Sequence, residues 1–237
     1  MNADRLDELL ERKRLLESLP PQSADFARRL QALRAWQSSR LADTYRDLHE
    51  DPRYSQAVEF FLSDLYGPQE FVDRNRNLTR ALRYLRRALP AAAVNVLQRA
   101  VELDVLSTEL DHAMVKALPA GAICESTYAT AFRAVGIPTA RVKQIELTVD
   151  LGADLDRIVN RTWLGPLLRA AHAPAHAAGL GPLQDFLERG FDAFREMRGA
   201  GRLLDAVKER ETDFMHRMLR GADGPVGTPN DSFTRLR

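Results

Sequence analysis

The sequence predicts an all-α protein, a single multi-helical, bundle-like domain of about nine or ten helices. Apolar residues recur three or four positions apart through most of the chain, which is the spacing of one helix face. Proline and glycine stand where these patterns begin and end, and no stretch combines strand alternation with a hairpin turn. Since 237 residues are about as many as one hydrophobic core organises, we expect one domain over residues 1–220.

The first half of the chain is expected to form five helices. Their approximate ranges are 4–18, 23–49, 51–67, 71–88 and 90–118. The first has leucines on one side and ends at Pro20-Pro21, and residues 1–20 could form a separate helix used in association. Ser23 can cap the second helix. Asp51-Pro52 is typical of a helix start and Gly67-Pro68 of a helix end, which bounds the third.

The second half has more breaks but the same character. Helices are expected at about 126–135, 138–160 and 163–172, the first of them ended by Gly136. Gly179-Leu180-Gly181-Pro182 starts another helix, and a last one follows Gly199-Ala200-Gly201. From Gly221 onward the chain is rich in glycine, proline and polar residues without a period, so we expect residues 221–237 to be disordered.

Charge and hydropathy exclude several classes of protein. Lys and Arg number 34 against 33 Asp and Glu, a net charge of +1, whereas nucleic-acid-binding domains are usually strongly basic. Charged residues interrupt every apolar run before the roughly 20 residues that a membrane span requires. The N-terminus lacks the pattern of a secretory signal, and the single cysteine, Cys124, suits a reducing compartment. We therefore expect a cytoplasmic protein with neither a membrane span nor a nucleic-acid partner.

The strongest local pattern is cationic. Four arginines spaced 4, 3 and 4 residues apart share one side of the expected helix 71–88: Arg76, Arg80, Arg83 and Arg87. Such a row needs solvent, acidic side chains or a bound anion. One candidate match is the acidic row on the expected helix 138–160, formed by Glu146, Asp150 and Asp154. The arginine row could therefore pair with these carboxylates or face solvent. Alternatively, it could bind a protein or phosphate partner.

A second pattern offers metal ligands. Glu109 and His112 form an E-x-x-H pair on the expected helix 90–118, and residues three apart on a helix can reach one metal ion. Glu102, seven residues before Glu109, could add a third ligand. The second E-x-x-H pair of di-iron bundles is missing, so surface Glu and His residues are the simpler interpretation. We predict no cofactor and keep a metal site at Glu102, Glu109 and His112 as a hypothesis.

Other reactive side chains give weaker signals. His49 near the end of the second helix could bind a haem or a metal, although a histidine there is more often placed to suit the helix dipole. His172 and His176 are four residues apart, but Pro174 between them is expected to interrupt the helix. Cys124 has no histidine nearby, and we expect its neighbour Glu125 to raise the pKa of the thiol.

One segment carries a family resemblance. Residues 60–68, Phe-Phe-Leu-Ser-Asp-Leu-Tyr-Gly-Pro, contain an F-F-x-x-D-L-Y-G signature, followed by the arginines of 74–87. The chain resembles an uncharacterised bacterial family of helical proteins with this signature. The resemblance implies an intact helical domain, and it implies nothing about activity or cofactors. Asp64 is expected to be partly buried and paired with one of the arginines, or to line a ligand pocket with Tyr66 and an arginine.

No complete catalytic set of residues is visible. The sequence therefore favours a binding or regulatory protein that acts through protein contacts, with a homodimer through the leucines of the first helix as one form. The alternative is a helical-bundle enzyme or small-ligand carrier dependent on a metal or a haem, in the style of haem-oxygenase-like or ferritin-like folds.

Overall fold

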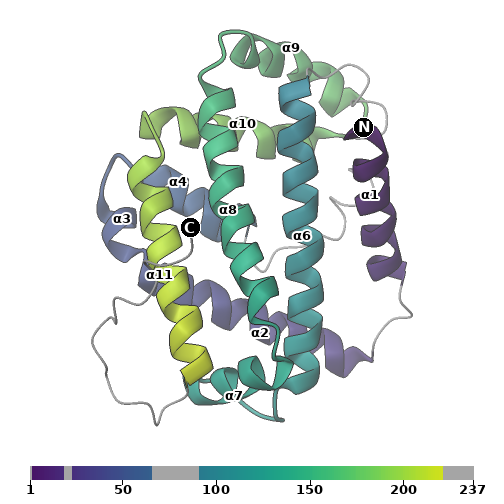
Figure 1. Ribbon diagram of the computed structural model, residues 1–237. Coiled ribbons are helices and arrows are strands. Elements are labelled where there is room, and N and C mark those ends of the chain that lie inside the picture. The colour runs from purple at the N-terminus through teal and green to yellow at the C-terminus, as the bar shows by residue number, and fades with distance from the viewer. Residues whose placement is uncertain (1, 19–22, 66–90, 221–237) are drawn as a thin grey trace, which may run out of the picture.

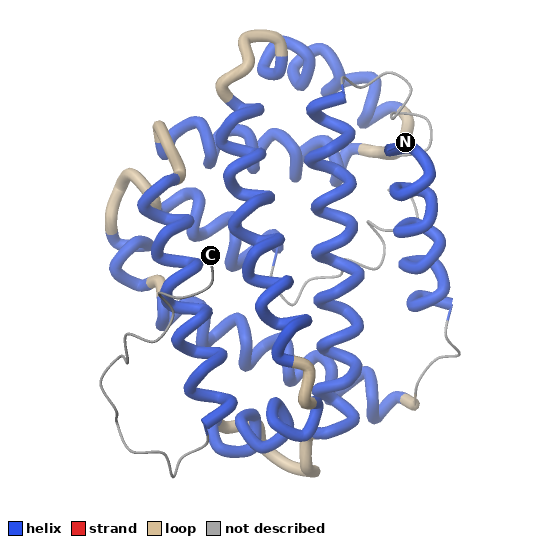
Figure 2. The backbone as a smooth tube through the Cα atoms, in the orientation of Figure 1, coloured by secondary structure: helices blue, strands red, loops and turns tan. Residues whose placement is uncertain are grey.

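The chain folds as a bundle of helices. The computed structural model describes residues 2–18, 23–65 and 91–220, and these ranges contain ten α-helices, one π-helical turn and no strand (Figures 1 and 2). This confirms the predicted all-α, bundle-like class. The expected helix 71–88 and the expected disordered tail lie outside the described residues.

Most helices begin and end close to the predicted residues. In chain order they are α1 (Asn2–Ser18), α2 (Ala24–Thr44), α3 (Arg46–Glu50), α4 (Ser55–Phe60), the π turn η1 (Phe61–Leu65), α6 (Ala91–Ala117), α7 (Glu125–Val135), α8 (Pro138–Val159), α9 (Leu164–Ala177), α10 (Gly181–Met197) and α11 (Gly201–Arg220). Ser23 caps α2 by accepting a hydrogen bond from the Phe26 amide at 3.3 Å. Gly136 ends α7 in the left-handed region, with φ at 64°.

The second and third expected helices are subdivided. The predicted helix 23–49 ends at Thr44, because Tyr45 adopts φ −109° and ψ 17° and the chain turns into α3. This turn places the Tyr45 hydroxyl where it donates a hydrogen bond to Glu211 of α11 at 2.9 Å. Asp51 does not start a helix directly. Residues 51–54 form turns, in which the Asp51 carboxylate accepts from the Arg53 amide at 3.0 Å, and α4 begins at Ser55.

Four helices lie side by side in the order α11, α8, α6 and α1 (Figure 1). The helices α2 and α7 lie towards the lower ends of these four helices in Figure 1, while α9 and α10 lie towards their upper ends. Consequently α6 packs on α8 along one side and on α1 along another.

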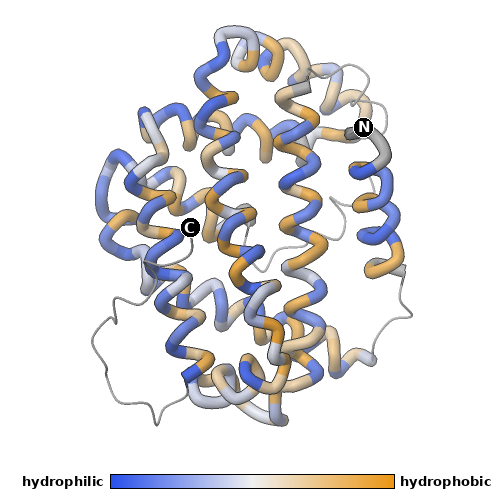
Figure 3. Tube along the Cα trace, viewed as in Figure 1, coloured by the Kyte–Doolittle hydropathy of each residue, from blue (hydrophilic) through white to orange (hydrophobic). Residues whose placement is uncertain are grey.

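Three clusters of apolar side chains stabilise the fold. One joins α2, α3 and α4 to α8, α10 and α11 around Phe194, and a second joins α2, α6, α7 and α11 around Met114. The third, as far as the described residues go, contains side chains of α1 and α6 only. Hydrophilic and hydrophobic residues alternate along the helices (Figure 3), and within the described ranges none is long and apolar enough to cross a membrane.

Candidate functional site

The contact between α1 and α6 is a continuous seam with its own apolar centre. We call this contact the α1–α6 seam. Its members are Leu6, Leu9, Leu10, Lys13 and Leu16 of α1 and Val94, Leu97, Val101, Asp104 and Val105 of α6. Leu6 and Leu10 are 0% and 2% exposed. Since apolar burial is the main favourable term in helix packing, these leucines hold α1 on the bundle.

A buried lysine interrupts the leucines of the seam. Lys13 occupies the apolar face of α1 two turns after Leu6, and its side chain is only 9% exposed. Its Nζ atom donates a hydrogen bond to the carboxylate of Asp104 on α6. A buried charge is costly unless it is paired, so this contact tolerates only a partner with a carboxylate at that position. In coiled coils a single polar residue at such a place specifies register.

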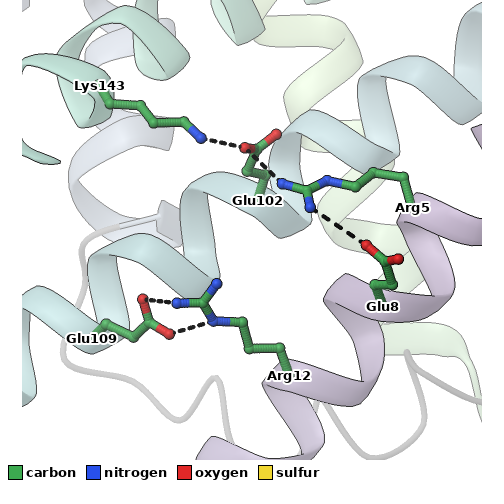
Figure 4. Close-up of polar contacts among 6 residues, drawn as sticks. All are labelled: Arg5, Glu8, Arg12, Glu102, Glu109 and Lys143. Atoms are coloured by element: carbon green, nitrogen blue, oxygen red, sulfur yellow. Dashed lines mark hydrogen bonds and ion pairs between the residues drawn. The ribbon is translucent and has the colours of Figure 1, made fainter.

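Ion pairs border the apolar centre and repeat every seven residues. Arg12 donates two hydrogen bonds to Glu109, from Nε to Oε1 at 2.6 Å and from Nη2 to Oε2 at 2.9 Å, and Arg5 donates to Glu102 at 3.4 Å (Figure 4). Both pairs join residues 97 positions apart, so the two helices run parallel in a single register. This is the spacing of a short parallel coiled coil.

A third helix contributes to the same network. Lys143 of α8 donates a hydrogen bond to Glu102 Oε1 at 2.6 Å. Burial opposes ionisation of Glu102, but the hydrogen bond and charge of Lys143 together with the charge of Arg5 hold the pKa of Glu102 below its ordinary value. Glu102 is therefore a carboxylate that joins α1, α6 and α8.

The structure separates the three predicted metal ligands. Arginine side chains of α1 pair with Glu102 and Glu109. His112 instead packs edge-on against Phe26 of α2, with ring centroids 5.3 Å apart. Burial, followed by the charge of Arg34, lowers the pKa of His112. Within the part of the chain that the structure describes, the ligand atoms of these three residues form no common cluster. Metal binding by them stays a prediction.

Several of the predicted binding residues lie outside the described residues. These are Tyr66 and the arginines Arg76, Arg80, Arg83 and Arg87, and the structure also describes nothing of the Asp64 side chain. In the acidic row of α8, Asp150 and Asp154 lie next to an arginine of α6. Arg99 donates a hydrogen bond to Asp154, and its Nη2 lies 3.9 Å from the Asp150 carboxylate.

The expectation for Cys124 is wrong in direction. Hydrogen bonds with the Ser126 hydroxyl and then with Thr127 lower the pKa of Cys124 to about 7. The cause is the position of the cysteine as the residue that precedes α7, where small hydroxylic side chains fold back towards it. The thiol is exposed, beside a shallow hollow of about 550 Å³ between α2, α7 and α11.

Sequence reasoning missed the seam although its signals are present. The leucines of α1 were recognised, but their partner on α6 was not. The matching signal is the equal spacing of Arg5 and Arg12 on one helix and of Glu102 and Glu109 on the other. Spacing alone does not distinguish a metal ion from an arginine as the partner of these two carboxylates.

One comparison with known proteins identifies a family. A family model described as "Domain of unknown function (DUF8198)" matches residues 19–225. This range contains every described helix except α1, which ends at Ser18. No curated protein and no solved structure matches the chain.

Proposed function

The chain belongs to the family described as a domain of unknown function (DUF8198), and from this premise we propose that it is a binding or regulatory protein that acts through helix-to-helix contacts. We further propose that α1 is its exchangeable arm. The partner is a second copy of the chain, whose α6 receives α1 in place of its own. The observation that carries this proposal is the parallel, register-specific seam in which the buried Lys13 pairs with the partly exposed Asp104.

The seam supports exchange because it is separate from the rest of the core. Among the described residues, its apolar cluster contains side chains of α1 and α6 only, so removal of α1 takes no described member from the two larger clusters. The helix α1 also lies outside the residues that match the family model. An arm of this kind can leave one domain and bind an identical one, as in domain swapping.

The chemistry of α6 favours α1 as the incoming helix. The incoming helix must present leucines where Leu6, Leu9 and Leu10 lie and a cation where Lys13 lies. Two further cations must reach Glu102 and Glu109. The helix α1 of another copy meets these conditions. Because the contacts are the same within one chain and between two, the dimer is expected to depend on protein concentration.

We place this role in the cytoplasm. The support is the single cysteine, Cys124, which is free and exposed and so suits a reducing compartment. The alternative of a metal- or haem-dependent enzyme receives less support, because two of its three proposed ligands, Glu102 and Glu109, are paired with cations.

Complementary charge reversals test the exchange. In the Lys13→Glu chain two carboxylates face each other in the seam, and in the Asp104→Lys chain two lysines do. Neither variant can close its own seam without placing two like charges side by side, and a buried charge that has lost its partner is strongly destabilising. Mixed together, the two chains can exchange α1 and restore a carboxylate–lysine pair at both seams. We therefore expect a heterodimer in native mass spectrometry only after mixing.

A matched pair of reversals serves as the control. Arg210 and Asp47 join α11 to α3 within the main body, with Nη1 and Oδ1 2.7 Å apart. Each of the Arg210→Glu and Asp47→Lys chains keeps an intact seam, so each alone is expected to dimerise as the unmodified chain does, and mixing them is expected to cause no increase in dimer. If the mixed Lys13→Glu and Asp104→Lys chains stay monomeric, α1 binds only within its own chain and the proposal is wrong.

A further inference from the structure

The helices α9 and α10 bring four polar side chains together at one end of the molecule, far along the chain from the seam. Figure 1 shows α9 next to α10 at this end, and the two helices are packed against each other. His172 and His176 come from α9, while Asp185 and Glu188 come from α10. All four are at least partly exposed to solvent.

The interruption expected at Pro174 does not occur. The helix α9 continues to Ala177 with Pro174 inside it, so His172 and His176 lie one turn apart on the same face. Proline removes one amide donor, and its effect is tolerated here because Pro174 and Ala170, whose carbonyl loses that donor, are both exposed to water. The two imidazole rings lie with their centroids 4.5 Å apart.

This arrangement fits the ligands of one transition-metal ion. His176 Nε2 lies 2.8 Å from Asp185 Oδ1, and one ligand atom from each of His172, His176 and Asp185 lies within 4.8 Å of the other two. Two ligands bonded at about 2.0–2.2 Å to a tetrahedral zinc ion lie roughly 3.3 Å apart, so small side-chain rotations complete the site. Histidines four residues apart on a helix are a recurrent pair of zinc ligands.

A second layer of contacts orients the histidine ligand. Glu188 lies 3.0 Å from His172 Nδ1, which leaves the Nε2 atom of His172 for a metal ion. Gln184, buried at 5% exposure, donates one hydrogen bond to Glu188 and another to the Leu168 carbonyl, both at 2.8 Å. Carboxylates that hold a ligating histidine in this way are typical of zinc sites.

A glycine makes room for the other histidine. A Cβ atom at Gly181 would lie 2.6 Å from His176 Nδ1, so any larger residue there would displace the ring. Gly181 is the first residue of α10 and is itself buried. The close approach of α10 to His176 therefore depends on the absence of a side chain at position 181.

We propose that His172, His176 and Asp185 bind a divalent transition-metal ion of the zinc class, with Glu188 as a positioning residue. Two imidazoles and one carboxylate suit Zn²⁺ better than Mg²⁺ or Ca²⁺, which prefer oxygen ligands alone. Three protein ligands leave one position of the ion open to water. The ion would join α9 to α10, and the proposal is independent of the exchange of α1.

Calorimetric titration of the full chain with zinc sulfate, after treatment with a chelator, tests the site. We expect one zinc ion per chain, and at least ~10-fold weaker binding after His172→Asn, His176→Asn or Asp185→Asn. Glu188→Gln is expected to retain binding with a smaller loss than His176→Asn, since it alters only the orientation of a ligand. Magnesium chloride is expected to give no saturable binding.

His216→Asn is the matched control, because His216 is an exposed histidine of α11 outside this cluster. It is expected to bind zinc as the unmodified chain does, and circular dichroism of each variant checks that the helices are intact. The proposal is overturned if the unmodified chain shows no stoichiometric zinc binding. Equal affinity of the His176→Asn variant and the unmodified chain would overturn it as well.

Discussion

The α1–α6 seam and the aromatic contact between α4, η1 and α10 hold helices together by different means. The seam has an aliphatic centre, a buried lysine and a border of ion pairs. The second contact joins Phe60 to Phe186 and Phe61 to Phe194, with ring centroids 5.1 and 6.1 Å apart. Phe194 belongs to the largest apolar cluster of the described residues, and Phe61 packs on it. The buried members of that cluster come from six helices, whereas those of the seam come from two.

This difference has a consequence for stability. Loss of a contact in the large cluster affects every helix that shares the cluster, whereas loss of a contact in the seam affects α1 and the face of α6 that it covers. Proteins open in cooperative units whose free energies differ, and units with few buried contacts open first. We therefore expect α1 to detach without unfolding of the remaining helices.

The largest expected effect is that of Phe194→Ala. Phe194 is 1% exposed and lies in the middle of the large cluster, so removal of its ring leaves a cavity that rigid helices fill incompletely. We expect the free energy of global unfolding to fall by about 3–5 kcal/mol. Urea unfolding followed by circular dichroism measures this, and a loss below about 1 kcal/mol would contradict the central place given to Phe194.

A smaller and more local effect is expected from Leu10→Ala. Leu10 is 2% exposed, and its truncation removes about 2–4 kcal/mol from the docking of α1 rather than from the whole bundle. Hydrogen exchange followed by mass spectrometry should show faster exchange in residues 2–18 and little change in α10. Leu15→Ala is the control, because Leu15 is 55% exposed on the same helix. Equal acceleration in α1 and α10 would show that the seam is not a separate unit.

The extent to which sequence predicts this fold follows the range of the interactions. Local signals succeeded: Gly136 ends α7 and Ser23 caps α2, because a left-handed turn and a capping hydroxyl act within a few residues. The break at Tyr45 was missed because a residue of α11, Glu211, accepts the hydrogen bond of its hydroxyl. The break expected at Pro174 does not occur, since the cost of a proline in a helix depends on exposure that the sequence does not show.

The candidate sites follow the same rule. The pairing of Glu109 with Arg12 and of Asp154 with Arg99 depends on which helices become neighbours, and spacing along one helix contains no such information. The proposed zinc ligands come from two helices, and the contribution of α10 depends on the packing of α9 against α10, which spacing along the chain does not show.

The smallest expected effect concerns an exposed ion pair of the main body. Arg210 donates two hydrogen bonds to Asp47, at 2.7 and 2.8 Å. These hydrogen bonds lower the pKa of Asp47 from 3.8 to about 2. A carboxylate whose pKa is lower in the folded state stabilises that state above its unfolded pKa, and the contribution disappears as the pH falls through the folded pKa. The window of loss is therefore from about pH 4 down to about pH 2.

Exposure to solvent limits the contribution of the Arg210–Asp47 pair to the unfolding free energy. In this respect the pair differs from Lys13 and Asp104 in the seam. The Asp47 side chain is 54% exposed, whereas the Lys13 side chain is 9% exposed. Solvent screening reduces the Asp47 pair to below about 1 kcal/mol. Asp47→Asn should lower the unfolding free energy by that amount at pH 7 and by almost nothing at pH 2, as measured by urea unfolding. If the loss instead persists undiminished at pH 2, Asp47 stabilises the helices through packing or capping rather than through its charge.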